Sequence, residues 1–249
     1  MKWAYGVTTV PERIGDLLPR TLRSLAAGGF DTPRLFVDGT DSRNMVKEFG
    51  LDATLHWPRV LCAANWSLAM AELVHRHPDA ARYAIFQDDC VTMRNLRRYL
   101  ESCRFPERGY LNLYTFRDNE EVIKNQPHGW YEAKVLGGAE QAAPYYWQGG
   151  KGAVGLVFDR AGALALLASD HFWQKAFCGD RRGRQIDGTI VTAMNKVQFR
   201  EYVHNPSLLQ HLGEKSTVRM GANDNGVPHA QAWSFPGEGW DALELSAAK

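Results

Sequence analysis

Two adjacent carboxylates follow directly on a short apolar run near residue 85. Residues 83–86 read YAIF, and Gln87, Asp88 and Asp89 come next. Neighbouring carboxylates repel each other, and neither is stabilised by an apolar core. At the end of a strand they suit a hard cation such as Mg²⁺ or Mn²⁺, which takes carboxylate oxygens and keeps open positions for phosphate. The alternative is an ordinary pair of helix-capping or loop aspartates.

The elements that would position this pair alternate between strand and helix. Strand-like stretches cover residues 2–9, 34–39, 52–57, 83–89, 109–116 and 152–158. Helix-like stretches cover residues 16–30, 42–50, 65–77, 159–169 and 187–196. This alternation predicts an α/β fold of the Rossmann-like class, with a mixed, mostly parallel sheet flanked by helices.

Ligands of such sheets bind at the carboxyl ends of the strands. Polar groups stand at three of these ends, namely Thr8 with Thr9, Asp38, and the pair Asp88 and Asp89. We therefore expect the two carboxylates to lie at the mouth of the ligand site.

The composition is that of a folded domain without a strong charge bias. The chain has 249 residues, of which 45% are hydrophobic, and a formal net charge of +1. That charge gives no overall attraction to nucleic acid or to an anionic membrane. The four cysteines lack CxxC spacing, which argues against a zinc ribbon or a disulfide scaffold. No apolar run suits a signal peptide or a membrane anchor, so we expect a cytoplasmic protein.

Four stretches together resemble the GT-A glycosyltransferases, which use a nucleotide-diphosphate sugar. QDD at 87–89 resembles their metal-binding DxD or xDD motif at the end of a central strand. Residues 6–25 resemble their opening strand, nucleotide-contacting loop and first helix. Residues 65–73 resemble a helix that carries an asparagine near the nucleotide, and 205–217 a late segment whose histidine joins the metal. Their order and spacing make the resemblance more specific than any one stretch.

The resemblance implies a metal-dependent hexosyltransferase built as a single compact GT-A-like domain over residues 1–249. Residues 1–90 would form the nucleotide-sugar-binding half, 91–220 the acceptor-binding half, and 221–249 an irregular C-terminal tail. The implied donor is a UDP-sugar, the implied cofactor a divalent cation (Mn²⁺ or Mg²⁺), and the implied setting the cytoplasm of a bacterial cell or a phage-infected host.

The resemblance also implies roles for individual residues. The cation is expected on Asp89 and His211, with His204 as the second choice of histidine and Asp88 turned toward the ribose. The expected nucleotide-sugar contacts are Thr8, Thr9, Val10, Glu12, Arg13, Asp38, Asn65, Asp88, Gly213, Lys215 and Ser216. Asp187 would be the catalytic base of an inverting enzyme. In a retaining enzyme it would only position a substrate, and as an ordinary N-cap it would do neither.

The acceptor is left open between a saccharide, a protein and a hydroxymethylated base in phage-type DNA. The expected acceptor contacts are Trp147, Gly150, Gly152 and Arg182. Residues 117–147 show no clear period and match no part of the family pattern. Two other functions remain as alternatives: a sugar nucleotidyltransferase, and a non-catalytic module that binds a nucleotide sugar or a glycan. A GxGxxG match at 150–155 leads into a strand-like run, so we do not expect it to bind a pyrophosphate.

Overall fold

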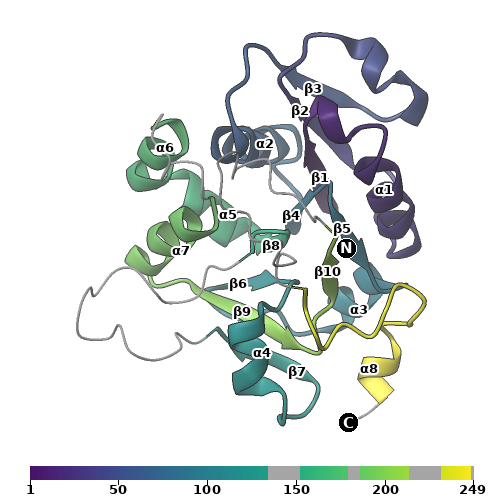
Figure 1. Cartoon of the computed structure of the whole chain (residues 1–249). Coiled ribbons are helices and arrows are strands. Elements are labelled where there is room, and N and C mark those ends of the chain that lie inside the picture. The colour runs from purple at the N-terminus through teal and green to yellow at the C-terminus, as the bar shows by residue number, and fades with distance from the viewer. Residues whose placement is uncertain (134–151, 179–185, 213–230, 248–249) are drawn as a thin grey trace, which may run out of the picture.

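The computed structural model describes residues 1–133, 152–178, 186–212 and 231–247. Its centre is an eight-stranded sheet in the order β3-β2-β1-β4-β8-β6-β9-β7 (Figure 1). The strands are β1 (Trp3–Thr9), β2 (Arg34–Asp38), β3 (Ala53–His56), β4 (Arg82–Gln87), β6 (Gly109–Asn112), β7 (Gly129–Glu132), β8 (Gly155–Asp159) and β9 (Arg200–Asn205). Strands β3, β2, β1 and β4 pair in parallel, as do β6 and β9, whereas β8 and β7 run antiparallel to their neighbours. The prediction of a mixed, mostly parallel α/β sheet in one domain is confirmed.

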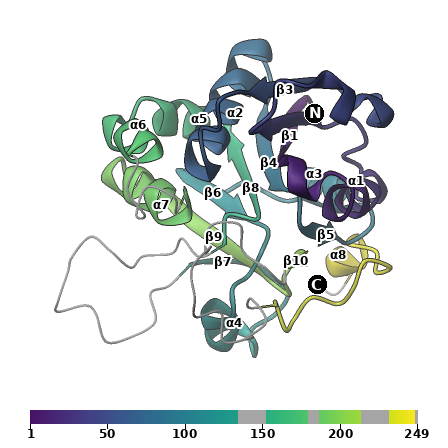
Figure 2. The same cartoon turned by 45° about the horizontal axis from the view of Figure 1, so that its top comes forward.

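Helices cover both faces of this sheet (Figure 2). One face carries α2 (Cys62–Arg76), α5 (Arg160–Leu167), α6 (Asp170–Phe177) and α7 (Ile186–Lys196). The other face carries α1 (Leu17–Ala27), α3 (Leu96–Ser102) and a two-stranded sheet of β5 (Cys90–Thr92) and β10 (Leu209–His211). The remaining elements are η1 (Pro11–Arg13), η2 (Arg43–Met45), η3 (Lys47–Phe49), α4 (Arg117–Ile123) and α8 (Glu244–Ala247). No helix in the described part of the chain is both long and apolar enough to cross a membrane.

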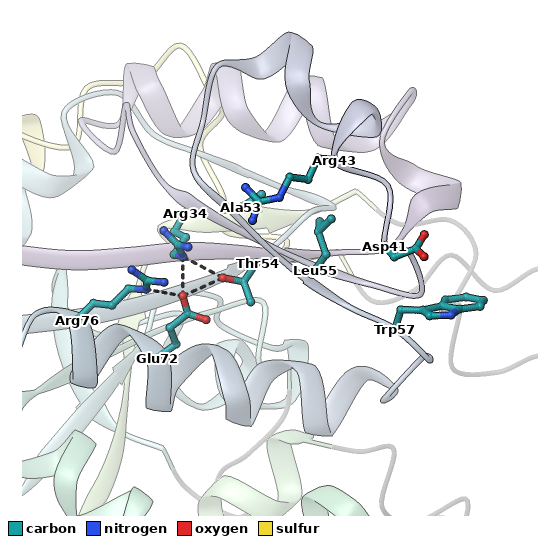
Figure 3. Close-up of a pocket in the computed structure, with 9 residues that line it drawn as sticks. All are labelled: Arg34, Asp41, Arg43, Ala53, Thr54, Leu55, Trp57, Glu72 and Arg76. Carbon is teal, nitrogen blue, oxygen red and sulfur yellow. Dashed lines mark hydrogen bonds and ion pairs between the residues drawn. The ribbon is translucent and has the colours of Figure 1, made fainter.

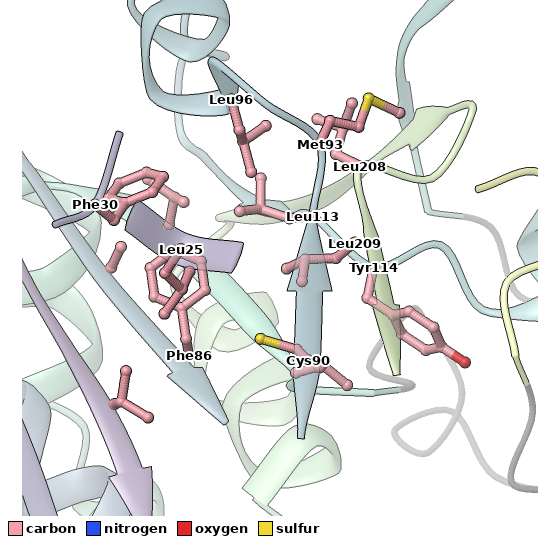
Figure 4. Packing of buried hydrophobic residues seen from close by; sticks show 14 of the residues in the cluster. Leu25, Phe30, Phe86, Cys90, Met93, Leu96, Leu113, Tyr114, Leu208 and Leu209 are labelled. Carbon is pink, nitrogen blue, oxygen red and sulfur yellow. The ribbon is translucent and has the colours of Figure 1, made fainter. Parts of the chain in front are cut away.

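Strand β4 is buried on both faces, which explains its unbroken apolar run. Tyr83 and Ile85 belong to the core under α2, whereas Ala84 and Phe86 belong to the core under α1 and α3. Phe86 packs at its end of the strand near Phe30, with the ring centroids 5.0 Å apart (Figure 4). The strand is thereby fixed on both sides at the point where the two aspartates follow.

Three expected elements differ in detail. Residues 42–50 form two short 3₁₀ helices instead of one helix. The strand expected over 109–116 ends at Asn112, because the side-chain oxygen of that residue accepts the backbone N–H of Tyr114 at 3.1 Å and turns the chain. Residues 117–133, which show no period in the sequence, include α4 and the edge strand β7.

The part of the C-terminal tail that the structure describes, residues 231–247, is held against the body. The buried carboxylate of Glu120 on α4 accepts the backbone N–H groups of Trp233 and Ser234 at 2.8 and 2.9 Å. Further along, Arg94 exchanges backbone hydrogen bonds with Trp240 and Ala242, each at 2.9 Å. The tail therefore crosses from α4 to the start of α3.

Gly6 on β1 leaves room for the ring of Phe36 on the neighbouring strand. A Cβ atom at Gly6 would collide with that ring and lie 2.9 Å from the carbonyl oxygen of Arg34. We expect Gly6→Ala to lower the free energy of unfolding by about 1–3 kcal/mol, since the strand pair must open to admit the methyl group. Urea denaturation measures the change. The matched control is Gly15→Ala, whose Cβ meets nothing within 4 Å and should leave stability almost unchanged.

Candidate active site

The two aspartates lie in the turn between β4 and β5, at the carboxyl edge of the parallel strands. Both are buried, with 3% and 2% of their surfaces exposed. The Thr9 hydroxyl donates to Asp88 Oδ2 at 2.6 Å, and the Thr21 hydroxyl of α1 donates to the Asp88 carbonyl at 2.7 Å. The first strand and the first helix thus hold the turn in place, as expected from the strand-end rule.

One guanidinium nitrogen bridges the pair. Arg13 Nη1 lies 2.8 Å from Asp88 Oδ1 and 2.6 Å from Asp89 Oδ2. Arg13 comes from η1, in the loop after β1. In this structure Arg13 contacts the two aspartates, and its expected contact with the nucleotide sugar stays a prediction.

His211 approaches Asp89 from the other side. Strand β10 pairs antiparallel with β5 so that His211 stands opposite Cys90, and Leu212 N donates to the Asp89 carbonyl at 2.7 Å. This register places His211 Nε2 3.1 Å from Asp89 Oδ2. Two ligands at neighbouring corners of an octahedral Mg²⁺ site stand roughly 3 Å apart, given metal–oxygen distances near 2.1 Å. The distance is that of a hydrogen bond between the two side chains, and it also brings them close enough to share a cation.

The second histidine candidate, His204, is placed differently. It is fully buried, with its Nδ1 2.7 Å from the Pro206 carbonyl and its Nε2 2.7 Å from the Tyr99 hydroxyl. A carbonyl only accepts, so Nδ1 carries the proton and Nε2 accepts from Tyr99. Burial lowers the pKa of His204 to about 4, and both nitrogens are used. The geometry favours His211.

The carboxyl groups of the pair have opposite pKa shifts. Burial and the charge of Asp89 raise the pKa of Asp88 to about 6, against the pull of Arg13 and Thr9. Burial also acts to raise the pKa of Asp89, but hydrogen bonds and charge from His211 and Arg13 together hold it below its ordinary value. Asp89 is therefore the member that stays ionised.

One carboxylate oxygen of Asp89, Oδ1, is buried without a hydrogen bond to any described residue. A buried carboxylate oxygen without a partner is costly, and a cation would satisfy it. Over the same residues, no cluster of three or more His, Cys, Asp or Glu side chains is arranged as a metal site. A cation here would take its remaining ligands from water or phosphate, as Mg²⁺ usually does.

Asp187 lies in the first turn of α7 and is held by two backbone groups. Its Oδ2 accepts from Gly152 N at 3.2 Å and its Oδ1 from Gly188 N at 3.0 Å. Burial raises the pKa of Asp187, although these hydrogen bonds oppose the rise. Asp187 is thus a first-turn acid of α7 that also holds the loop leading into β8 through Gly152.

Gly152 connects Asp187 to the histidine side of the site. It adopts φ +79°, and a Cβ there would lie 2.5 Å from the ring of Tyr114. On its other side that ring is 6.4 Å, centroid to centroid, from the ring of His211. Tyr114 therefore lies close to both Gly152 and His211, and nothing in the sequence pattern indicated this position.

Cys62, the first residue of α2, was also missed by the sequence analysis. Burial and the charges of Asp187, Asp89 and Asp88 raise its pKa to about 12. The thiol is therefore within electrostatic reach of both the aspartate pair and Asp187. No pattern in the sequence indicated this role, since the helix was expected to begin at residue 65 and begins at Cys62.

Several expected nucleotide contacts have structural partners here. Asp38 accepts from the backbone N–H groups of Val60 and Leu61 at 2.7 and 2.9 Å, so both oxygens brace that loop. Asn65 contacts His56 Nδ1 at 2.9 Å and donates to the Phe36 carbonyl at 3.1 Å.

The expected nucleotide contacts at the end of β1 and in the loop after it have weaker or more exposed partners. The Thr8 hydroxyl donates to the Phe86 carbonyl at 3.4 Å, and Glu12 pairs with Arg59 on the surface at 2.8 Å. Val10 caps η1 without a side-chain hydrogen bond. Six expected contacts lie outside the described residues: Trp147, Gly150, Arg182, Gly213, Lys215 and Ser216.

A cavity of about 500 Å³ lies at the edge strand β3 and shares no lining residue with this site (Figure 3). Glu72 stands in it between Arg34 and Arg76, at 2.8 and 2.6 Å, and also accepts from the Thr54 hydroxyl at 2.8 Å. Glu72 is thus paired with the two arginines, and these contacts hold the edge of the sheet. The cavity is not part of the aspartate site.

Comparison with known proteins supports the fold. No family model matches the sequence, and no curated protein matches it either. The solved structure of GalNAc-T7 with UDP, GalNAc and Mn²⁺ is similar with a TM-score of 0.50 at 10% identity, over 84% of this chain and 44% of that chain. This chain thus spans less than half the length of that protein. A CMP:2-keto-3-deoxy-manno-octonic acid synthetase complexed with CTP has a TM-score of 0.45 at 12% identity, over 82% of this chain and 89% of that chain. At 10% identity, the likeness to GalNAc-T7 shows a shared GT-A-like fold and nothing beyond the fold.

The position of Cys62 leads to a prediction about its reactivity. With a pKa of about 12 against an ordinary 9.0, alkylation by iodoacetamide at pH 8 should be ~10³-fold slower than in the urea-unfolded chain. The rate should keep rising from pH 8 to 10, whereas a shielded thiol of ordinary pKa would level off. Asp187→Asn should speed the reaction. Peptide-level mass spectrometry measures each rate, and an unchanged rate in Asp187→Asn would show that Asp187 is too distant.

Proposed function

We propose that the chain is a metal-dependent glycosyltransferase that moves a hexose from a nucleotide-diphosphate donor, with UDP the expected nucleotide. The observation that carries this proposal is the facing pair Asp89 and His211 at the carboxyl end of β4. Asp89 Oδ1 has no hydrogen-bond partner among the described residues, and Asp89 Oδ2 lies 3.1 Å from His211 Nε2; both observations are compatible with a shared divalent cation. The GT-A-like fold supports the proposal, because it puts ligands at this sheet edge.

The chain's own residues have distinct tasks in this proposal. A divalent cation, when bound, acts as a Lewis acid that neutralises charge on the leaving diphosphate. Asp89 and His211 would hold it, while Thr9 fixes Asp88 for the ribose. Lys215, Ser216 and the backbone of Gly213 remain the proposed diphosphate contacts.

Asp187 is the proposed base for the acceptor hydroxyl. Its raised pKa brings the carboxylate closer to the value at which a base works well near neutral pH. The Gly152 N–H fixes one of its oxygens, which leaves the carboxylate in one orientation. The acceptor is proposed to be a saccharide, a protein or a modified DNA base, with contacts from Gly152 and from Trp147, Gly150 and Arg182.

The proposed donor chemistry predicts that the nucleotide sugar is slowly hydrolysed in a metal-dependent reaction when no acceptor is present. Incubated with Mn²⁺ and a panel of nucleotide sugars, the protein should slowly hydrolyse one of them, and EDTA should stop it. Asp89→Asn should reduce the rate by ~10²-fold or more, since the amide cannot supply the anionic ligand. Asp41→Asn, at an exposed aspartate beside the β3 cavity, is the control and should leave the rate unchanged.

The same panel separates the competing function. A sugar nucleotidyltransferase would form pyrophosphate from a nucleoside triphosphate and a sugar 1-phosphate. Pyrophosphate release without any nucleotide-sugar hydrolysis would replace our proposal with that one. Nucleotide-sugar binding without turnover, with or without acceptors, would indicate a binding module.

Asp187→Asn tests the base. Asparagine keeps the shape and one backbone hydrogen bond but cannot take a proton, so transfer to the acceptor should fall by ~10²–10⁴-fold. Nucleotide-sugar affinity and melting temperature should hold, because the side-chain oxygen of asparagine can still accept one of the two backbone N–H groups in the first turn of α7. Transfer assays with radiolabelled donor provide the measurement. A near-normal rate would reject the base and favour a retaining reaction in which Asp187 only positions a substrate.

A further inference from the structure

We infer that Arg13 is a resident counter-ion of the aspartate pair, which leaves Asp89 when a divalent cation binds and turns to the donor's diphosphate. This inference rests on the proposed function, because it concerns the same site. It adds an exchange of one positive charge for another, which the family pattern does not describe.

The first support is the position of the guanidinium. A single nitrogen, Arg13 Nη1, contacts one oxygen of each carboxylate, at 2.8 Å to Asp88 Oδ1 and 2.6 Å to Asp89 Oδ2. A bridging cation would use the same oxygens. Arg13 therefore stands where an incoming metal ion would need ligands.

The second support is electrostatic necessity. The side chains of Asp88 and Asp89 are only 4% and 3% exposed, and that of Arg13 is 13% exposed. Two adjacent buried carboxylates without a cation would be strongly destabilising. Arg13 relieves this repulsion in the metal-free protein.

The third support is competition for one oxygen. Asp89 Oδ2 already accepts from Arg13 at 2.6 Å and faces His211 Nε2 at 3.1 Å. A cation held by Asp89 Oδ2 would compete with the guanidinium for that oxygen. Arginine cannot discharge by losing a proton, so the two positive charges cannot share this place.

The loop that carries Arg13 is only partly buried. None of the three residues of η1 is fully buried, its start has no side-chain cap, and the Arg13 side chain keeps 13% of its surface exposed. A guanidinium that leaves a carboxylate pair finds another anionic partner in a diphosphate, whose oxygens it can bind through two nitrogens. The exchange then links cation binding to donor binding.

The experiment is a Mn²⁺ titration without nucleotide, followed by the electron paramagnetic resonance signal of free Mn²⁺. Arg13→Gln should bind Mn²⁺ about tenfold or more tightly than the wild type, because the competing charge is gone. Arg13→Lys, which keeps the charge, should bind it as weakly as the wild type. Arg20→Gln is the matched control, since Arg20 pairs with Glu238 at the exposed surface and should not alter the affinity.

Melting temperatures show whether the Arg13→Gln variant still folds. Arg13→Gln should melt at a lower temperature than the wild type in EDTA, and Mn²⁺ should raise its melting temperature more. A variant folded only in Mn²⁺ supports the inference, because the ion then supplies the missing charge. A variant unfolded in both conditions contradicts it, as does equal or weaker Mn²⁺ binding by Arg13→Gln.

A separate measurement tests whether Arg13 binds the diphosphate. In saturating Mn²⁺, Arg13→Gln should bind UDP about tenfold more weakly than the wild type. Equal UDP affinity would overturn the exchange.

Failure of the proposed function gives a different pattern. If neither the wild type nor Arg13→Gln binds Mn²⁺, and Asp89→Asn behaves like both, the cation site itself is absent. If the wild type binds Mn²⁺ through Asp89 but Arg13→Gln binds it no better, only the inference about Arg13 fails.

Discussion

Two carboxylates placed side by side in a nearly closed turn need positive charge close by, and the site is organised around that need. Asp88 and Asp89 are almost fully buried, and Arg13 supplies the charge from a loop more than seventy residues away in the sequence. The threonines of β1 and α1 hold the turn so that the charges meet. The loop after β1, the first helix and the strand end are thus tied together by one electrostatic constraint.

The packing of the sheet offsets the repulsion between the two aspartates. Alternate side chains of β4 fill the core on each face, so the strand cannot tilt or slide to relieve the repulsion at its end. The burial energy of residues such as Tyr83 and Phe86 offsets the cost of bringing two anions together. A site under electrostatic strain is found where the scaffold is most rigid.

The sequence was sufficient for those parts of the fold that follow from periodicity. The apolar run at 83–86 is buried on both faces, and the alternation of the first half produced β1 to β4 with α1 and α2 close to their expected positions. The elements of the second half were harder to predict from the sequence. The turn at Asn112 depends on its side chain, and β10 forms only because β5 is there to pair with it.

The site was predictable to the extent that it lies at strand ends. Asp89 and His211 do face each other, but their contact depends on a strand register that no local pattern encodes. Asp38 at the end of β2 and Asn65 on α2 show the opposite limit, because polar side chains near the strand ends also hold backbone groups, and the sequence cannot separate the two roles. Tyr114 and Cys62 were not identified because packing, and not spacing, brings them to the site.

The β5–β10 pairing has a consequence for how the protein comes to exist. Asp89 and His211 are 122 residues apart, and the ribosome has completed most of the chain before the second of them emerges. Strands β1 to β4, Arg13 and both carboxylates are all synthesised before His211. Arg13 is therefore available to the aspartates earlier than His211, and the contact of Asp89 with His211 can form only once β10 pairs with β5.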